Sequence, residues 1–101
     1  MDTNLTKIEV IALEWVSMDY ESIPTILENV VSDLGSPVTE LELFEVLSSL
    51  REKGVIESYS YAKKQNSFIP KSPDANSIND TWWLVTCSGL NLIKNVNGAA
   101  L

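Results

Sequence analysis

Apolar positions recur at helical spacing after Thr6 and before a break at residues 19–21, and they predict the first helix of the chain. Thr6 and Glu9 have the spacing of a capping box, in which a hydroxyl and a carboxylate satisfy free backbone N–H groups at a helix start. Four apolar residues share one face of this helix: Ile8, Ile11, Ala12 and Trp15. Three more extend the apolar surface nearly all round: Val10, Leu13 and Val16. Such a helix is either central in the core or shared with a second subunit.

An amphipathic stripe after a break at residues 19–21 predicts a second helix. Ser22 can cap this helix, and Pro24 is tolerated in the first turn, where few backbone donors need partners. The stripe recurs at steps of three and four residues: Ile23, Ile26, Leu27, Val30, Val31 and Leu34. Gly35 is expected to end the helix, because glycine readily adopts the left-handed conformation needed there.

A third helix is predicted from Thr39, which forms a second capping box with Glu42. Its core stripe consists of four residues: Leu43, Val46, Leu47 and Leu50. Lys53 in the last turn and Gly54 just beyond it are typical of a helix C-terminus.

Two segments rich in β-branched and aromatic residues, 55–61 and 81–85, predict two strands that pair as a hairpin. The polar residues between them, 63–80, include two prolines and are long for a hairpin connection. They form a mobile or functional loop, or they contain a short element. Thr86 then caps a short C-terminal helix that carries Leu90, Ile93 and Val96, and residues 97–101 are expected to be a frayed tail.

Together these elements predict a single α+β domain over residues 1–101. It would contain a three-helix bundle with a helix-turn-helix, a two-stranded β-hairpin with a long loop, and a short C-terminal helix. A chain of this length can bury a core large enough to fold without disulfides or metals.

Two segments of this arrangement resemble those of PadR-type and MarR-type transcriptional regulators. Residues 47–56 resemble the end of a recognition helix entering the wing, with two leucines, charged residues, Lys-Gly and an aliphatic pair. Residues 83–89 resemble the matching end of the wing, where an aromatic strand runs into Leu-Thr-x-x-Gly. The resemblance implies a winged-helix fold, whose third helix would lie in the major groove of DNA.

The chain departs from these regulators in three ways. They usually carry lysine or arginine near the positions of Cys87 and Ser88, where this chain has neither. They carry arginine at the wing tip, whereas residues 57–85 contain lysine only. They often have a long dimerisation helix, whereas residues 87–101 are all that follows the wing. These departures weaken the implied DNA binding.

Histidine is absent and Cys87 is the single cysteine, which removes the commonest general base, the ordinary zinc ligands and any internal disulfide. A site for a hard cation built only from carboxylates stays open. Ser88-Gly89 lacks the frame of a nucleophile elbow, and no phosphate-binding glycine loop is present. We therefore expect no enzymatic activity and no cofactor, and we expect Cys87 to be a small buried hydrophobic residue.

No stretch approaches the ~20 apolar residues that a membrane helix needs, and the N-terminus lacks the pattern of a signal peptide. A single cysteine also suits a reducing compartment. We therefore expect a cytoplasmic protein with no membrane partner.

The net charge of −7 is spread unevenly, because residues 1–50 carry ten acidic side chains and one basic one. The face of the third helix opposite its core stripe carries Glu42, Glu45 and Glu52. Carboxylates there oppose the phosphate attraction that supplies most non-specific DNA affinity. This face is either an ordinary solvated surface or a functional acidic surface, and both interpretations argue against insertion into the major groove.

The predicted loop carries the candidate wing contacts Lys63, Lys64 and Lys71, and Tyr59, Tyr61 and Phe68 lie within or beside it. Lysines interleaved with aromatic residues can grip a phosphate backbone or stack on unpaired bases. Lysines in a polar loop also commonly serve solubility alone.

Trp82 and Trp83 are expected to point to opposite faces of their strand. One would pack on the helices, and the other would be exposed or covered by loop 63–80 or by a partner. Leu41 and Phe44 lie off the core stripe of the third helix, so they join the tryptophans as a candidate interface.

The preferred hypothesis is a non-catalytic winged-helix module that acts through protein–protein contacts, as a homodimer or with another protein partner. The alternative is a DNA-binding transcriptional regulator of PadR/MarR type that uses its lysine-bearing wing. Nucleic acid is the partner that the charge distribution disfavours.

Overall fold

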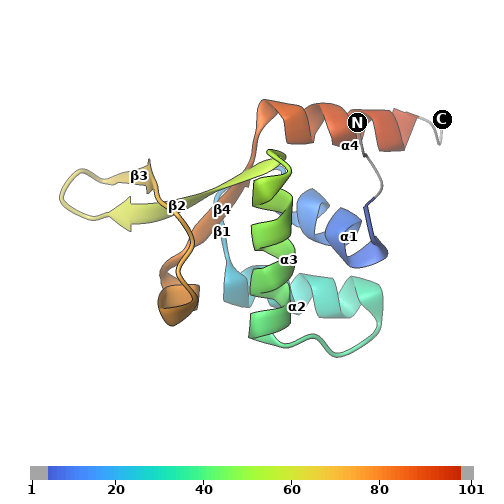
Figure 1. The fold of residues 1–101 in the computed structure, drawn as a ribbon, viewed down its shortest axis with the longest axis horizontal. Coiled ribbons are helices and arrows are strands. Elements are labelled where there is room, and N and C mark those ends of the chain that lie inside the picture. The colour runs from blue at the N-terminus through green and yellow to red at the C-terminus, as the bar shows by residue number, and fades with distance from the viewer. Residues whose placement is uncertain (1–4, 99–101) are drawn as a thin grey trace.

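Three helices pack together on one side of the molecule, and an antiparallel sheet extends away from them (Figure 1). The computed structural model describes residues 5–98. The elements in chain order are α1 (Lys7–Trp15), β1 (Glu21–Ser22), α2 (Ile23–Leu34), α3 (Glu40–Glu52), β2 (Ile56–Ala62), β3 (Ser67–Pro70), the 3-10 helix η1 (Ala75–Asp80), β4 (Trp82–Val85) and α4 (Cys87–Gly98). The predicted α+β class is confirmed.

Both predicted capping boxes are present and fix where α1 and α3 begin. The Glu9 N–H donates to Thr6 Oγ1 and the Thr6 N–H to Glu9 Oε1, at 3.2 and 2.9 Å. Glu42 and Thr39 repeat this exchange, with the Glu42 N–H bond at 3.1 Å and the Thr39 N–H bond at 3.0 Å. Each box satisfies backbone donors that would otherwise lack partners, which stabilises a helix by about 1 kcal/mol.

The start and end of α2 follow the prediction only in part. Ser22 is the N-cap residue and Pro24 lies in the first turn, but the Ser22 side chain accepts no capping hydrogen bond. At the other end, Gly35 has a φ of 73°, the left-handed conformation that glycine adopts without strain. Gly54 ends α3 in the same way, with a φ of 79°.

The core lies where α1, α2 and α3 meet and where the sheet covers them. Its buried apolar residues are Ala12, Leu13, Val16, Ile23, Ile26, Val30, Leu43, Phe44, Leu47, Leu50, Val55, Ile56 and Trp83. The helix stripes predicted from spacing supply most of this set. Trp83 comes from β4 and packs edge-on to Phe44 of α3, with ring centroids 6.0 Å apart.

The sheet has four strands in the order β1-β4-β2-β3, so the prediction of a two-stranded hairpin is wrong in its strand number. The predicted pair exists, because β2 and β4 pair in antiparallel register from Ile56 opposite Val85. On the far side of β4, β1 adds two residue pairs. On the far side of β2, β3 pairs with its outer half. β2 has backbone groups at both edges, so β3 pairs along the edge that β4 does not occupy.

Of the two alternatives predicted for residues 63–80, the one with a short element is confirmed, because the segment holds β3 and η1 and is not one long loop. A tight turn connects β2 to β3 and places Asn66 at a φ of 49°, a conformation that asparagine tolerates. Pro70 ends β3 at the edge of the sheet, where a missing N–H is acceptable. Asp74 caps η1 by accepting from the Asn76 N–H at 2.9 Å.

The last helix, α4, runs across the helical side of the molecule and packs on α1 and β4 (Figure 1). The predicted cap is present, because the Gly89 N–H donates to Thr86 Oγ1 at 3.2 Å. A Cβ atom at Gly89 would lie 2.1 Å from the Val55 carbonyl oxygen, so only glycine fits this contact. The helix ends at Gly98, which places the first two residues of the predicted frayed tail in the helix, and residues 99–101 lie outside the described residues.

Within residues 5–98 no helix is both long enough and apolar enough to cross a lipid bilayer.

Candidate functional site

The outward face of α3 carries three carboxylates, and Glu42, Glu45 and Glu52 are all exposed. Glu42 is partly engaged, because its carboxylate belongs to the capping box that starts the helix. Neither of the other two side chains forms a hydrogen bond or ion pair among the described residues. We call these three residues the α3 acidic face.

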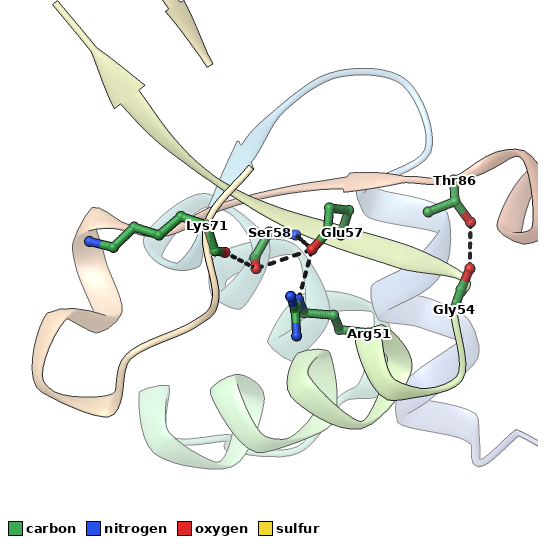
Figure 2. A network of polar contacts seen from close by, with 6 residues as sticks. All are labelled: Arg51, Gly54, Glu57, Ser58, Lys71 and Thr86. Carbon is green, nitrogen blue, oxygen red and sulfur yellow. Dashed lines mark hydrogen bonds and ion pairs between the residues drawn. The ribbon is translucent and has the colours of Figure 1, made fainter. Parts of the chain in front are cut away.

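The two cations at the end of α3 are bound by other carboxylates. Arg51 Nε lies 2.7 Å from Glu57 Oε1, and Lys53 Nζ lies 2.8 Å from Glu9 Oε2 (Arg51 and Glu57 in Figure 2). Arg51 is the chain's single arginine. Both cations are therefore committed within the molecule and do not offset the α3 acidic face.

The pKa values of the acidic partners in these pairs, Glu9 and Glu57, are both lowered. Burial disfavours ionisation of Glu9, but hydrogen bonds from Lys53 and Thr6 outweigh it and lower the pKa of Glu9 below its ordinary value. Burial also opposes the charge of Glu57, whereas hydrogen bonds from the Ser58 N–H and Arg51 lower its pKa. Both carboxylates are therefore held as anions that neutralise their cations.

A polar network links the end of α3 to the sheet (Figure 2). Glu57 Oε1 accepts from the Arg51 side chain and from the Ser58 N–H, and buried Ser58 donates its hydroxyl to the Lys71 carbonyl. Beside it, the Thr86 hydroxyl donates to the Gly54 carbonyl at 2.7 Å. The network fixes where the β2–β3 hairpin leaves the helices, which is a structural role.

The three candidate lysines are exposed, and none forms an ion pair within the described residues. Lys63 and Lys64 lie in the turn between β2 and β3. Lys71 follows β3 beside Ser58, and its ammonium points away from the polar network (Figure 2). At 3.3 Å per residue, roughly 15 Å of hairpin separates Lys71 from the turn. The lysines therefore occupy two places on the hairpin and not one.

The candidate interface is not brought together. Trp83 is completely buried against α3, which confirms that one of the two tryptophans packs on the helices and removes it from the candidate interface. Phe44 is 8% exposed, so the prediction that it joins an exposed patch is wrong. Phe44 is covered because α3 packs against the sheet as well as against α1 and α2, which widens its buried surface beyond one stripe. Leu41 is 53% exposed on α3, whereas Trp82 is half-buried on the sheet face that does not meet the core.

Trp82 belongs to a cluster of aromatic rings on this outer sheet face. The aromatic cluster consists of Tyr20, Tyr59, Tyr61, Phe68 and Trp82. Tyr20 stacks on Phe68 at 3.9 Å, and Phe68 meets Trp82 edge-on at 5.3 Å. Phe68 comes from segment 63–80, so the chain itself provides cover for Trp82. Burial, followed by the nearby Tyr20 and Glu57, raises the pKa of Tyr59.

A hollow beside the end of α1 was missed by the sequence interpretation. Trp15, expected on the core face of its helix, is 40% exposed, and Met18 in the following turn is 93% exposed. Both side chains line the hollow. The sequence feature that could have indicated this exposure is the position of Trp15 in the last turn before a break, where no further turn of helix covers it.

Cys87 is exposed at the start of α4, so the prediction that it is buried is wrong. The cause is that this first turn directs Gly89, and not Cys87, against the Val55 backbone. Within residues 5–98, no group of three His, Cys, Asp or Glu side chains is arranged to hold a metal ion.

Comparisons of the chain with models of protein families, with curated proteins and with solved structures return no match. The resemblance to PadR-type and MarR-type regulators therefore stays a prediction.

Proposed function

We propose that the chain is a non-catalytic winged-helix module that acts through protein contacts and does not place α3 in the major groove of DNA. Support for the winged-helix assignment comes from the element order, in which three helices precede the paired strands β2 and β4. The glycine and threonine positions of the resembling segments also have structural reasons here. Gly54 needs a positive φ, Thr86 caps α4, and Gly89 tolerates no side chain.

The observation that carries the proposal is the charge around α3. A helix that enters the major groove passes between two phosphate backbones, so the cations around it supply much of the affinity. Here Glu45 and Glu52 face outward without partners among the described residues, while Arg51 and Lys53 are bound by Glu57 and Glu9. One carboxylate could accept a hydrogen bond from cytosine, but a whole acidic face repels the backbone.

Fluorescence anisotropy with a labelled random-sequence duplex at 50 mM salt tests this proposal. Non-specific binding by DNA-binding proteins has a Kd of roughly 10⁻⁴–10⁻⁶ M at physiological salt and is tighter at lower salt. We expect no binding of the wild-type chain in this range. The variant E45K/E52K should gain weak, salt-sensitive binding, whereas the matched variant E14K/E28K, with the same change in net charge on α1 and α2, should gain less.

A second candidate function, DNA binding through the wing, has one observation in its favour. Lys63 and Lys64 project from the hairpin turn beside Tyr61, which is 39% exposed. If wild-type protein binds the duplex, and if K63Q/K64Q abolishes that binding, the wing function replaces the one we propose.

Self-association remains a prediction of the same proposal. Leu90 on the first turns of α4 is 42% exposed, which leaves an apolar side chain available to a second copy. Sedimentation equilibrium at millimolar protein should show a dimer, and a strict monomer would leave contact with another protein as the only mode of action.

A further inference from the structure

The hollow at the end of α1 combines exposed apolar side chains with a rim of carboxylates. Its volume is about 310 Å³, and its lining residues are Ile11, Glu14, Trp15, Met18, Glu21 and Asp33. We call it the Trp15 hollow. A volume of this size lies at the low end of that for ligand sites and accommodates one or two apolar side chains.

Trp15 is held in place although its ring is exposed. Its indole Nε1–H donates to Asp33 Oδ2 at 2.7 Å, which ties the last turn of α1 to α2. An aromatic ring already fixed in one orientation loses little conformational entropy when a partner docks against it. Trp15 and Met18 therefore offer a pre-organised apolar surface, and Met18 is the most exposed of the large apolar residues described.

The charges around the Trp15 hollow all have one sign. Glu14, Glu21 and Asp33 contribute carboxylates, and no lysine or arginine of the described residues lines it. Burial, followed by the neighbouring Asp19, raises the pKa of Glu21, and a cation placed there would offset the repulsion between the two carboxylates. A guanidinium could also lie over the exposed face of Trp15.

We propose that the Trp15 hollow binds a segment of another protein in which apolar side chains are flanked by lysine or arginine. This inference rests on the proposed function, in which the chain acts through protein contacts. Charge complementarity selects the occupant, because apolar side chains would fill the hollow and basic ones would pair with its rim. A second copy is disfavoured as the occupant, because a two-fold interface uses the same surface on both copies. The acidic rim of one hollow would then lie against the acidic rim of the other.

Two-dimensional ¹H–¹⁵N NMR with synthetic peptides tests the inference, because each tryptophan indole N–H gives its own signal. The probe is acetyl-Arg-Lys-Leu-Leu-Arg-Lys-amide, with serines replacing the leucines in one control and glutamates replacing the basic residues in another. We expect the first peptide to shift the Trp15 indole signal with a Kd of about 0.1–1 mM, a weak affinity typical of a short flexible peptide. The Trp82 and Trp83 signals should stay in place.

Paired variants locate the binding. Met18→Ser should weaken binding by about fivefold, and Glu14→Lys by about tenfold, since they remove apolar contact and reverse a rim charge. Leu41→Ser and Glu45→Lys make the same chemical changes at exposed positions of α3 outside the hollow, and they should leave the Kd unchanged within about twofold.

Three results would overturn the inference. The serine peptide could bind as well as the leucine peptide, which would mean that net charge alone attracts it. The α3 variants could weaken binding as much as the hollow variants. Met18→Ser could dissociate a dimer, which would assign the hollow to contact between copies. None of these results affects the duplex-binding assay, so the proposed function stands or fails separately.

Discussion

The outer sheet face and the end of α1 use aromatic residues in opposite ways. Five rings lie on the sheet face, but they pack on one another in stacked, tilted and edge-on pairs, and only Tyr61 among them is as much as 39% exposed. The end of α1 has one aromatic ring, Trp15, which lies open beside Met18. Aromatic content alone therefore does not identify an interaction surface. What matters is whether the chain itself covers the rings.

The same two regions differ in how their charges are used. On the helical side, Glu14 and Asp33 surround exposed apolar side chains and leave a field that attracts cations. On the hairpin, Lys63 and Lys64 lie at the turn and Lys71 lies well behind it. The acidic region can therefore act as a unit, whereas the basic residues act as separate charges.

The largest expected effect lies at Gly89, where α4, which packs on both α1 and β4, meets the backbone of Val55. Gly89→Ala should lower the free energy of unfolding by about 2–4 kcal/mol, because the added methyl group would clash with the Val55 carbonyl and force α4 away from the strands. Urea denaturation measures the change. Gly35→Ala is the control, since it meets a positive φ but no neighbouring atom within 4 Å, and should cost about 1 kcal/mol. Equal losses of unfolding free energy in the two variants would show that the close contact between Gly89 and the Val55 carbonyl does not exclude a side chain.

A smaller effect should separate covered from uncovered apolar residues. Phe68→Ala should cost about 2 kcal/mol, because Phe68 contacts Tyr20, Tyr61 and Trp82 and holds the aromatic cluster together. The fluorescence of Trp82 should also shift to the red, which is best measured in a Trp15→Phe background. Met18→Ala, at a residue that is 93% exposed, should change stability by no more than about 0.5 kcal/mol. Similar losses of stability in Phe68→Ala and Met18→Ala would contradict the distinction between covered and uncovered apolar residues.

The smallest effect concerns the carboxylates that bind cations in each region, Glu9 in α1 and Glu57 in β2. Because their folded-state pKa values are lowered from the ordinary 4.5, their contribution is complete above that pH and is lost as the pH falls through the folded values. Glu9→Gln should cost about 1 kcal/mol at pH 7 and flatten the loss of stability between roughly pH 5 and 3. Denaturation at a series of pH values checks this, with Glu45→Gln as an exposed control. If the stability of Glu9→Gln falls with decreasing pH in the same way as that of the wild type, Glu9 does not contribute to the pH dependence.

The helices could be predicted closely because their signals are local. Capping boxes at Thr6 and Thr39 and positive-φ glycines at Gly35 and Gly54 depend on neighbours three or four residues away. The strands β2 and β4 were also predicted within one residue, because their composition is distinctive. The sequence interpretation missed β1, which has two residues, and placed β3, which ends in proline, only as an unassigned short element within residues 63–80. Such short strands depend on a neighbouring edge and not on their own pattern.

The candidate site was harder to predict, because exposure is decided by elements distant in the sequence. The helical spacing of Trp15 indicates which way it points, but not whether another element reaches far enough to cover it. Phe44 shows the reverse, since it lies off the predicted stripe and is buried because α3 packs against the sheet, where Trp83 meets it edge-on. The α3 acidic face was predicted correctly as an exposed surface, because no element of the described part of the chain covers that side.

The ends of the sheet explain how a chain with this many aromatic residues can avoid aggregation. An unpaired strand edge invites another chain to add to it, and proline, lysine and short length all block that addition. Here one outer strand, β1, has two residues, and the other, β3, has four and ends at Pro70 directly before Lys71. Intermolecular strand pairing, the usual route from an exposed sheet to fibrils, therefore finds no long, flat template on either side.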